Sequence, residues 1–281
     1  MSHKMKYEIR YEPVREIVNG HRGGARSLVK KLDDSGFFHL SFSKISTVES
    51  CRYQYYLQYV KRVTLKKEPD GFVKGRAFHR AAASAFRRIS RGEVVVADDA
   101  AREAIRLHGE YWGGQIKNAL GLMIENRPAR WDVAGVEEIF ALDLGDGVPP
   151  CVGVVDLVLK LGDRYAVVDH KTGKDFWRSD AMQLAVYREH VLRSRGAKSC
   201  AGWFDDYRWV NDMRRIRKPA FRRTFVPLTN RLWNSALKRF RNGYESILRV
   251  ESEGEKSSGG GSCWMCSFRS LCPKAVLDSW Y

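Results

Sequence analysis

The sequence contains no apolar run near the roughly 18 residues that a membrane-spanning helix needs. Its first fifteen residues are charged and lack the apolar stretch of a secretory signal. We therefore expect a protein of a reducing compartment, the cytoplasm, without a membrane partner. In such a compartment the six cysteines are better interpreted as metal ligands or inert thiols than as a disulfide framework.

A phosphate-binding loop of the form G-x4-G-K-[ST] is also absent, because Gly173-Lys174 is followed by Asp175. ATP-driven unwinding of a duplex therefore cannot reside in this chain. Acidic residues are in deficit: 33 Asp and Glu stand against 49 Lys and Arg, for a net charge of +16 and a pI of about 9.7. Such an excess indicates a polyanionic partner, and nucleic acid is the natural one.

With 281 residues, 44% of them hydrophobic, the chain can bury one large core. We expect a basic arm at 1–37 (a strand pair or a loosely ordered segment), a compact domain at 38–250, a flexible Gly/Ser-rich linker at 251–262 and a cysteine-rich tail at 263–281. Apolar periodicity predicts helices at 41–59, 71–90, from 98 onward, at 179–195 and at 229–247, and strands at 136–144, 151–161, 164–169, 201–210 and 220–227. Ser41 or Ser43 and Thr229 are predicted N-caps, and Gly113-Gly114 is expected to weaken the third helix.

Two carboxylates and a lysine form a candidate catalytic group. Asp156 lies within an apolar strand, and Asp169 ends the next strand with Lys171 on the same side, since residues i and i+2 share a face. An isolated D-x-K is usually a surface ion pair. Asp156 makes that interpretation less attractive, because an unpaired carboxylate in an apolar run is costly. Two carboxylates can instead bind Mg²⁺ or Mn²⁺, with Lys171 orienting or deprotonating a water or stabilising charge on phosphate.

Five motifs in order resemble a known family. They are Ser41-x-Ser43 with Cys51, Tyr55 and Tyr56; Gly75–His79; Gly153–Asp156; Val167–Lys174; and Gln183 with Tyr187. Together they resemble the PD-(D/E)xK nuclease superfamily, and more narrowly its RecB-like exonuclease branch, which includes the Cas4-like nucleases. The resemblance spans roughly Leu40 to Pro273. It implies an α/β fold with a restriction-endonuclease-like core, a mixed central sheet flanked by helices, with helical N-terminal additions and the cysteine-rich tail.

The resemblance also assigns roles. His79 would be a metal ligand beside Asp156 and Asp169, although without the family a core histidine beside Phe78 is the simpler interpretation. The backbone carbonyl of His170 would add a ligand. Either Glu137 or Glu138 would supply a further carboxylate, and Glu138 is the one we favour. Gln183 and Tyr187, which could be a plain helix face, would line the site.

The cysteines Cys51, Cys263, Cys266 and Cys272 give four thiolates, which both zinc and a [4Fe–4S] cluster accept. Structural zinc sites usually combine two short cysteine pairs, so a split of one plus three fits zinc poorly. The iron–sulfur members of the RecB-like branch share this arrangement, which implies a [4Fe–4S] cluster that joins the Cys51 helix to the tail. Cys151 and Cys200 lie in apolar stretches and are expected to be buried.

A basic stretch follows the fourth predicted strand, with aromatic residues interleaved. Its candidate DNA-binding residues are Arg208, Arg214, Arg215, Arg217, Lys218, Arg222 and Arg223. Arg and Lys neutralise phosphates and aromatics stack on unpaired bases, although a solvated hairpin with core aromatics explains the pattern equally well. No base-reading motif is evident, so binding should be independent of sequence.

These features predict a metal-dependent DNA exonuclease acting mainly on single-stranded ends in repair, recombination or phage DNA processing, fed where needed by a separate helicase. One alternative is a Cas4-like factor that trims DNA for CRISPR spacer acquisition. The other is a non-catalytic iron–sulfur DNA-binding subunit, which the intact Asp156, Asp169 and Lys171 argue against.

Overall fold

The computed structural model describes residues 8–65, 69–145, 147–176, 179–209, 218–257, 263 and 266–273. The chain divides into two compact units, one made of residues 1–69, 139–153 and 234–281 and the other of residues 70–138 and 154–233. We call them the cysteine unit and the sheet unit. Their boundaries do not coincide with the predicted ones at 37/38 and 250/251. Among the described helices, none is long and apolar enough to cross a membrane.

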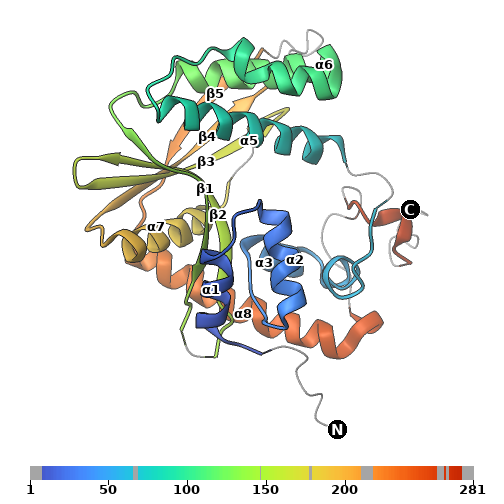
Figure 1. Ribbon diagram of the computed structural model, residues 1–281. Helices are drawn as coiled ribbons and strands as arrows, with labels where there is room; N and C mark the ends of the chain where they lie inside the picture. The colour runs from blue at the N-terminus through green and yellow to red at the C-terminus, as the bar shows by residue number, and fades with distance from the viewer. Residues whose placement is uncertain are drawn as a thin grey trace. The chain divides into compact units, whose positions relative to one another are not determined.

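The secondary-structure elements largely follow the predicted order (Figure 1). The helices are α1 (Tyr11–Asn19), α2 (Ala25–Ser35), α3 (Phe42–Ser50), α4 (Arg52–Tyr55), the π-helix η1 (Tyr56–Val60), α5 (Asp70–Ile89), α6 (Ala97–Glu125), α7 (Ala181–Arg195), α8 (Asn230–Glu253) and the short η3 (Gly254–Lys256) and η5 (Arg269–Leu271). The strands are β1 (Asp132–Leu142), β2 (Cys151–Leu161), β3 (Arg164–Gly173), β4 (Cys200–Arg208) and β5 (Ala220–Phe225).

The five strands form one mixed sheet in the order β1-β2-β3-β4-β5. β2 and β3 are antiparallel, β3 and β4 are parallel through the crossover helix α7, and β4 and β5 are antiparallel. Figure 1 shows α5 and α6 on one side of β3–β5 and α7 on the other. The predicted mixed sheet with flanking helices is confirmed.

The core of the sheet unit lies between the sheet and the two helices α5 and α6. Phe78 and Phe86 of α5 lie there in one buried cluster with Leu157, Val168 and Tyr207. These three residues come from β2, β3 and β4 and belong to the same buried face of the sheet. This packing fixes the face of α5 that carries His79 against the sheet.

In the cysteine unit, residues 11–35 form two helices, so the prediction of a strand pair or a loosely ordered arm at 1–37 is wrong. Val14 and Val18 of α1 and Leu28 and Leu32 of α2 are buried in one cluster with Val152. The spacing i, i+4 is helical. The apolar residues Val14, Ile17 and Val18, and likewise Leu28, Val29 and Leu32, carry this spacing within a highly charged segment.

Two predicted helices differ from expectation. The 41–59 helix is interrupted at Cys51, whose extended backbone separates α3 from α4 and whose Sγ accepts a hydrogen bond from the Gln54 N–H at 3.4 Å. In α6 the helix continues through Gly113-Gly114, yet a Cβ on Gly113 would lie 2.6 Å from the Ile105 Cα. Eight residues of a straight helix span about 12 Å, so α6 bends sharply before Gly113.

The N-caps and the linker were predicted with mixed success. Ser41 caps α3 by accepting from the Lys44 N–H at 3.2 Å, and Thr229 accepts from the Leu232 N–H at 3.2 Å at the start of α8. The linker prediction is wrong for residues 251–256, which are helical as the end of α8 and as η3. Residues 258–262 lie outside the described part of the chain.

Candidate active site

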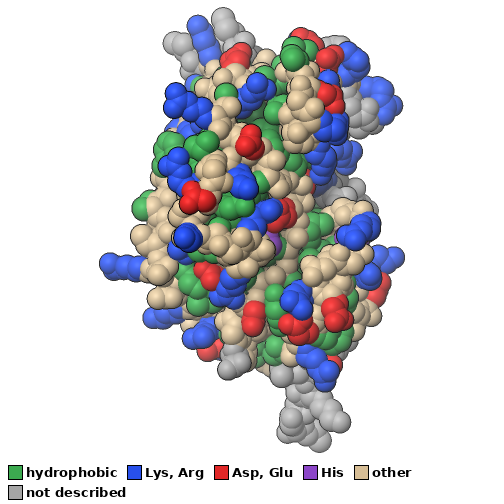
Figure 2. Space-filling model, turned by 60° about the vertical axis from the view of Figure 1, so that its left-hand side comes forward, with side chains coloured by type: hydrophobic (Ala, Val, Ile, Leu, Met, Phe, Trp, Pro, Cys, Tyr) green, Lys and Arg blue, Asp and Glu red, His purple; other side chains and the backbone are tan. Residues whose placement is uncertain are grey.

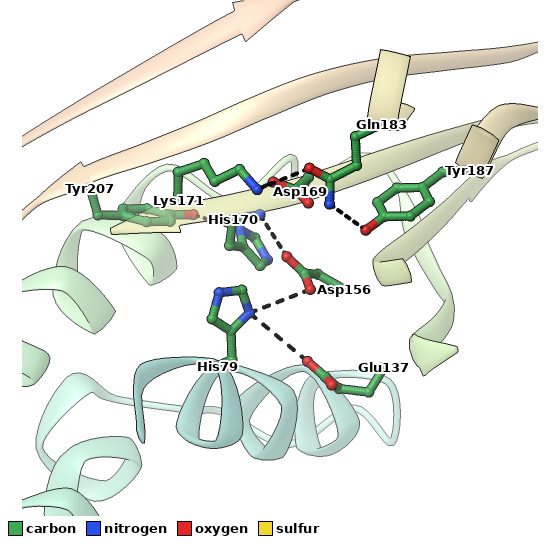
Figure 3. A network of polar contacts seen from close by, with 9 residues as sticks. All are labelled: His79, Glu137, Asp156, Asp169, His170, Lys171, Gln183, Tyr187 and Tyr207. Carbon is green, nitrogen blue, oxygen red and sulfur yellow. Dashed lines mark hydrogen bonds and ion pairs between the residues drawn. The ribbon is translucent and has the colours of Figure 1, made fainter. Parts of the chain in front are cut away.

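The candidate site lies where β2 and β3 stop pairing. Their antiparallel register runs from Leu161↔Arg164 to Leu157↔Val168, so Asp156 and Asp169 come directly after the last pair. Beyond this point the His170 N–H donates to the Asp156 Oδ2 at 2.8 Å instead of to a strand carbonyl. The fork lets His79 of α5 reach Asp156 and Gln183 of α7 reach Lys171, as Figure 3 shows.

On one side of the fork, three potential metal ligands converge. The His79 Nδ1 lies 3.4 Å from the Asp156 Oδ1 and 4.0 Å from the Glu137 Oε1 (Figure 3). Ligand atoms of His79, Glu137 and Asp156 all lie within 4.8 Å of one another. Each of the three side chains is partly exposed to solvent. One imidazole and two carboxylates thus point at a common volume that a single cation could fill.

Glu138, the carboxylate favoured from the sequence, is not part of this group, and that choice is corrected here. Its Oε1 lies 2.8 Å from the His190 Nε2, and its Oε2 contacts the Arg195 Nη2. Glu137 takes the site position because its φ of 49° interrupts the alternation of β1. A non-glycine residue in this left-handed region costs about 1–3 kcal/mol and is typical of functional sites. Period-two reasoning cannot foresee such a bulge.

On the other side of the fork a polar chain leads away from Asp169. The Lys171 Nζ lies 2.6 Å from the Asp169 Oδ2 and donates to the Gln183 Oε1 at 3.2 Å. The Gln183 amide then donates to the Tyr187 hydroxyl at 2.6 Å. Gln183 and Tyr187 are one turn apart on α7, so the helix presents both to β3. The structure therefore brings together four residues that the sequence motifs had named separately.

Burial and charge set the protonation of the group. Burial lowers the pKa of His79, but Asp156, Asp169 and Glu137 outweigh it and raise that pKa to about 9. Burial raises the pKa of Asp156, but His79 and the His170 N–H lower it by more than burial raises it, so the net shift is downward. Burial raises the pKa of Asp169 despite the nearby ammonium. The metal-free site thus holds an imidazolium between carboxylates.

The ammonium of Lys171 is held in its charged form. Burial lowers its pKa, but the ion pair with Asp169, together with Asp156 and Asp206, outweighs burial and raises it. Lys171 is therefore a cation at neutral pH and suited to stabilising negative charge rather than to removing a proton.

The His170 side chain packs against α5, with its ring centroid 6.5 Å from that of His79. The residue is 3% exposed, its ring stacks on Phe86 with centroids 5.7 Å apart, and its Nδ1 lies 3.2 Å from the Tyr207 hydroxyl. Its backbone carbonyl as a metal ligand stays a prediction. Asp206, which pairs in register with Lys171, is the site residue that the sequence analysis missed. The signal was Asp205-Asp206 inside an apolar strand, the same argument that singled out Asp156.

Among the predicted DNA-binding residues, Arg222 and Arg208 flank one ring, with guanidinium carbons 4.7 Å and 5.2 Å from the Phe176 centroid. Arg222 also donates to Asp206 at 3.0 Å. Lys218 is exposed and its carbonyl accepts from Arg208. Arg223 points to the opposite face, where it is paired with Asp205 at 2.7 Å and packs on Trp203, so its role is structural. The predicted residues Arg214, Arg215 and Arg217 lie outside the described residues.

Positive charge is not confined to that strand pair. Lys and Arg side chains are spread over the face drawn in Figure 2, with Asp and Glu side chains among them. The net charge of +16 therefore acts as a general field for a polyanion and does not by itself mark one binding path.

The four predicted cluster cysteines all belong to the cysteine unit and lie near one another. Burial raises the pKa of Cys266, and the neighbouring thiols of Cys51, Cys272 and Cys263 raise it further. The Cys266 Sγ lies 3.8 Å from the Gln54 Oε1, on the α4 turn that Cys51 caps. Within the described residues, no three of these sulfurs lie within 4.8 Å of one another. Cys151 and Cys200 are buried, as predicted.

Comparisons with known proteins agree with this geometry. The family model of the PD-(D/E)XK nuclease superfamily matches residues 39–273. No curated protein matches. The crystal structure of a candidate exonuclease from Eubacterium rectale aligns with a TM-score of 0.58 and 13% identity, covering 93% of this chain and 100% of that one. The crystal structure of SSO0001 aligns with 17% identity over 70% of this chain and 84% of that one. Its TM-score of 0.32 is too low to indicate a common fold. The chain belongs to the PD-(D/E)XK nuclease superfamily.

Proposed function

We propose that this nuclease is a metal-dependent exonuclease that hydrolyses DNA mainly from single-stranded ends. The observation that carries the proposal is the convergence of His79, Glu137 and Asp156 within 4.8 Å, beside a protonated Lys171. Carboxylate oxygens suit Mg²⁺ and Mn²⁺, and Mn²⁺ also accepts an imidazole nitrogen, so these residues fit the metal that the superfamily implies, with Mn²⁺ the better match. Asp169 is the further ligand expected from the motif.

When bound, such a cation stabilises charge on the scissile phosphate and makes a coordinated water more acidic. The chain's own residues do the rest. His79, Glu137 and Asp156 set the place of the reaction at the fork between β2 and β3. The Lys171 ammonium, held by Asp169 and Gln183, stabilises negative charge developing on a phosphate oxygen. Tyr187 fixes the Gln183 amide, and so keeps its carbonyl aimed at Lys171.

A path for the substrate strand is available on the surface beside Lys171. Lys171, Asp206 and Arg222 are register partners on three neighbouring strands, so their side chains share one face and Arg222 lies roughly 9.6 Å from Lys171. Arg222 and Arg208 can take phosphates of the substrate strand, and Phe176 holds both guanidinium groups. The Eubacterium rectale protein, described as a candidate exonuclease, has the same fold. A separate helicase would supply such ends from duplex DNA.

The spacing of the cysteines favours a [4Fe–4S] cluster over zinc. Structural zinc sites usually combine two short cysteine pairs, whereas this chain has one cysteine far from the other three. An iron–sulfur cubane takes four thiolates at its corners. Cys51, Cys263, Cys266 and Cys272 would hold it and tie α4 to the tail within the cysteine unit.

The test uses single-stranded DNA labelled at the 5′ or the 3′ end, incubated with anaerobically purified protein and Mn²⁺ or Mg²⁺. Wild type, Lys171→Ala and the matched control Lys160→Ala, an exposed lysine of β2, are compared. We expect metal-dependent loss of label with wild type and the control, but not with Lys171→Ala. Cleavage of circular single-stranded DNA, which has no ends, would show that the enzyme is an endonuclease rather than an exonuclease. Tight DNA binding without cleavage in all three proteins would instead favour the non-catalytic subunit.

A further inference from the structure

Two adjacent carboxylates on β1 face different surroundings. Glu137 points at His79, whereas Glu138 contacts His190 and Arg195 on the last two turns of α7. Both partners come from the helix that also presents Gln183 to Lys171. One helix therefore touches both sides of the candidate site.

The alternation of β1 is broken between these contacts. Val133 and Val136 both pack against the core between the sheet and α5 and α6, although residues three apart on a regular strand lie on opposite faces. Glu137 follows with a φ of 49°. Regular alternation from Val136 would turn Glu137 to the opposite face, but the left-handed backbone of Glu137 keeps its carboxylate on the face of His79 and leaves Glu138 over Gly135.

Gly135 makes the arrangement sterically possible. A Cβ at this position would lie 2.2 Å from the Glu138 Oε2 and 3.3 Å from the Arg195 Nη2. Arg195 also reaches the Ala134 carbonyl at 3.4 Å, and its guanidinium carbon lies 5.7 Å from the Tyr165 ring centroid. The carboxylate of Glu138 is thus fixed from two directions, and only a residue without a side chain fits beneath it.

We propose that Glu138, His190 and Arg195 form a clamp that locks the β1 bulge and thereby positions Glu137 as a metal ligand. Without the clamp, Glu137 can relax from its left-handed conformation and alternate with Val136, which withdraws its carboxylate from His79 and Asp156. Glu138 is a positioning residue and does not touch the metal or the DNA. The inference rests on the proposed metal-dependent function.

The experiment measures Mn²⁺ affinity by titration calorimetry, with thermal unfolding as a check that each variant is folded. Glu138→Gln should weaken Mn²⁺ binding by roughly 10- to 100-fold, the usual effect of removing a residue that orients a ligand. Glu137→Gln should weaken Mn²⁺ binding at least as much, and the double variant should bind Mn²⁺ no more weakly than Glu137→Gln alone. The matched control Glu189→Gln removes another partly buried, ion-paired carboxylate from α7 and should leave the Kd unchanged.

Gly135→Ala provides a second route if Glu138→Gln does not fold, because the added methyl displaces the Glu138 carboxylate without removing it. Wild-type affinity in folded Glu138→Gln or Gly135→Ala would overturn the clamp, and so would losses that add in the double variant. If wild type itself binds no Mn²⁺ and cleaves no DNA, the proposed function fails and the clamp with it. Wild-type binding with unaltered variants would overturn the clamp alone.

Discussion

Metal binding to this nuclease should release a proton from His79. The neighbouring carboxylates raise its pKa to about 9 in the metal-free site, so at pH 7 only about 1% of the molecules carry the neutral imidazole that a metal requires. The apparent affinity at pH 7 should therefore be about 100-fold below its value at high pH, or about 2.7 kcal/mol. Because the imidazolium must lose its proton, the affinity rises with pH, about tenfold per unit below pH 8.

Calorimetric titrations with Mn²⁺ between about pH 6.5 and about pH 8.5 test this expectation. Protonation of Asp169, whose pKa burial raises to about 6, contributes only at the lower end of this window. Titrations in two buffers of different ionisation enthalpy should report about one proton released per Mn²⁺ at pH 7. His79→Gln should bind more weakly and lose the pH dependence. Affinity that is independent of pH in wild type, without proton release, would refute the assignment of His79 as a protonated ligand.

Three further expectations concern other parts of the chain. Lys171→Ala should lower the cleavage rate by about 10²–10³-fold, as expected on removal of a charge-stabilising group, while Mn²⁺ still binds; an equal loss of metal affinity would contradict that role. Lys44 is buried beside His39, and burial lowers the pKa of Lys44 to about 8 from its ordinary value of 10.5. Between these two pH values the lysine of the unfolded chain binds a proton that the folded chain lacks. The free energy of unfolding of wild type relative to Lys44→Met should therefore rise with pH in that window, and a constant difference in urea unfolding would show that the ammonium is not perturbed. Cys266→Ser, purified anaerobically, should lose bound iron and melt at a lower temperature than wild type; an unchanged iron content would rule out the cluster ligand.

The sequence alone named most of the candidate site residues. Asp156 stood out because a carboxylate in an apolar strand needs a partner, whereas Gln183 and Tyr187 were named by the resemblance to the nuclease family. Both signals depend on local residue patterns, which the structure preserves as neighbouring positions on β2 and on α7. The sheet strands and the caps at Ser41 and Thr229 were equally local.

The errors lay where a contact far along the chain decided the outcome. Residues 11–35 became helices because Val14 and Leu32 are buried against Val152, a partner more than a hundred residues away. Glu137 rather than Glu138 faces His79 because α7 holds Glu138, and neither propensity nor periodicity encodes that choice.

By itself, then, the sequence determined the nuclease superfamily, the strand order along the chain and the chemistry of the ligands, since these depend on residue type and spacing. Only the tertiary structure decided which residues meet. The fork between β2 and β3 brings Asp156 to His79, a strained residue on β1 places Glu137 rather than Glu138 beside His79, and opposite faces of β5 separate Arg222 from Arg223. Each of these depends on pairing between distant segments, which is set by the packing of the whole sheet rather than by the residues nearby.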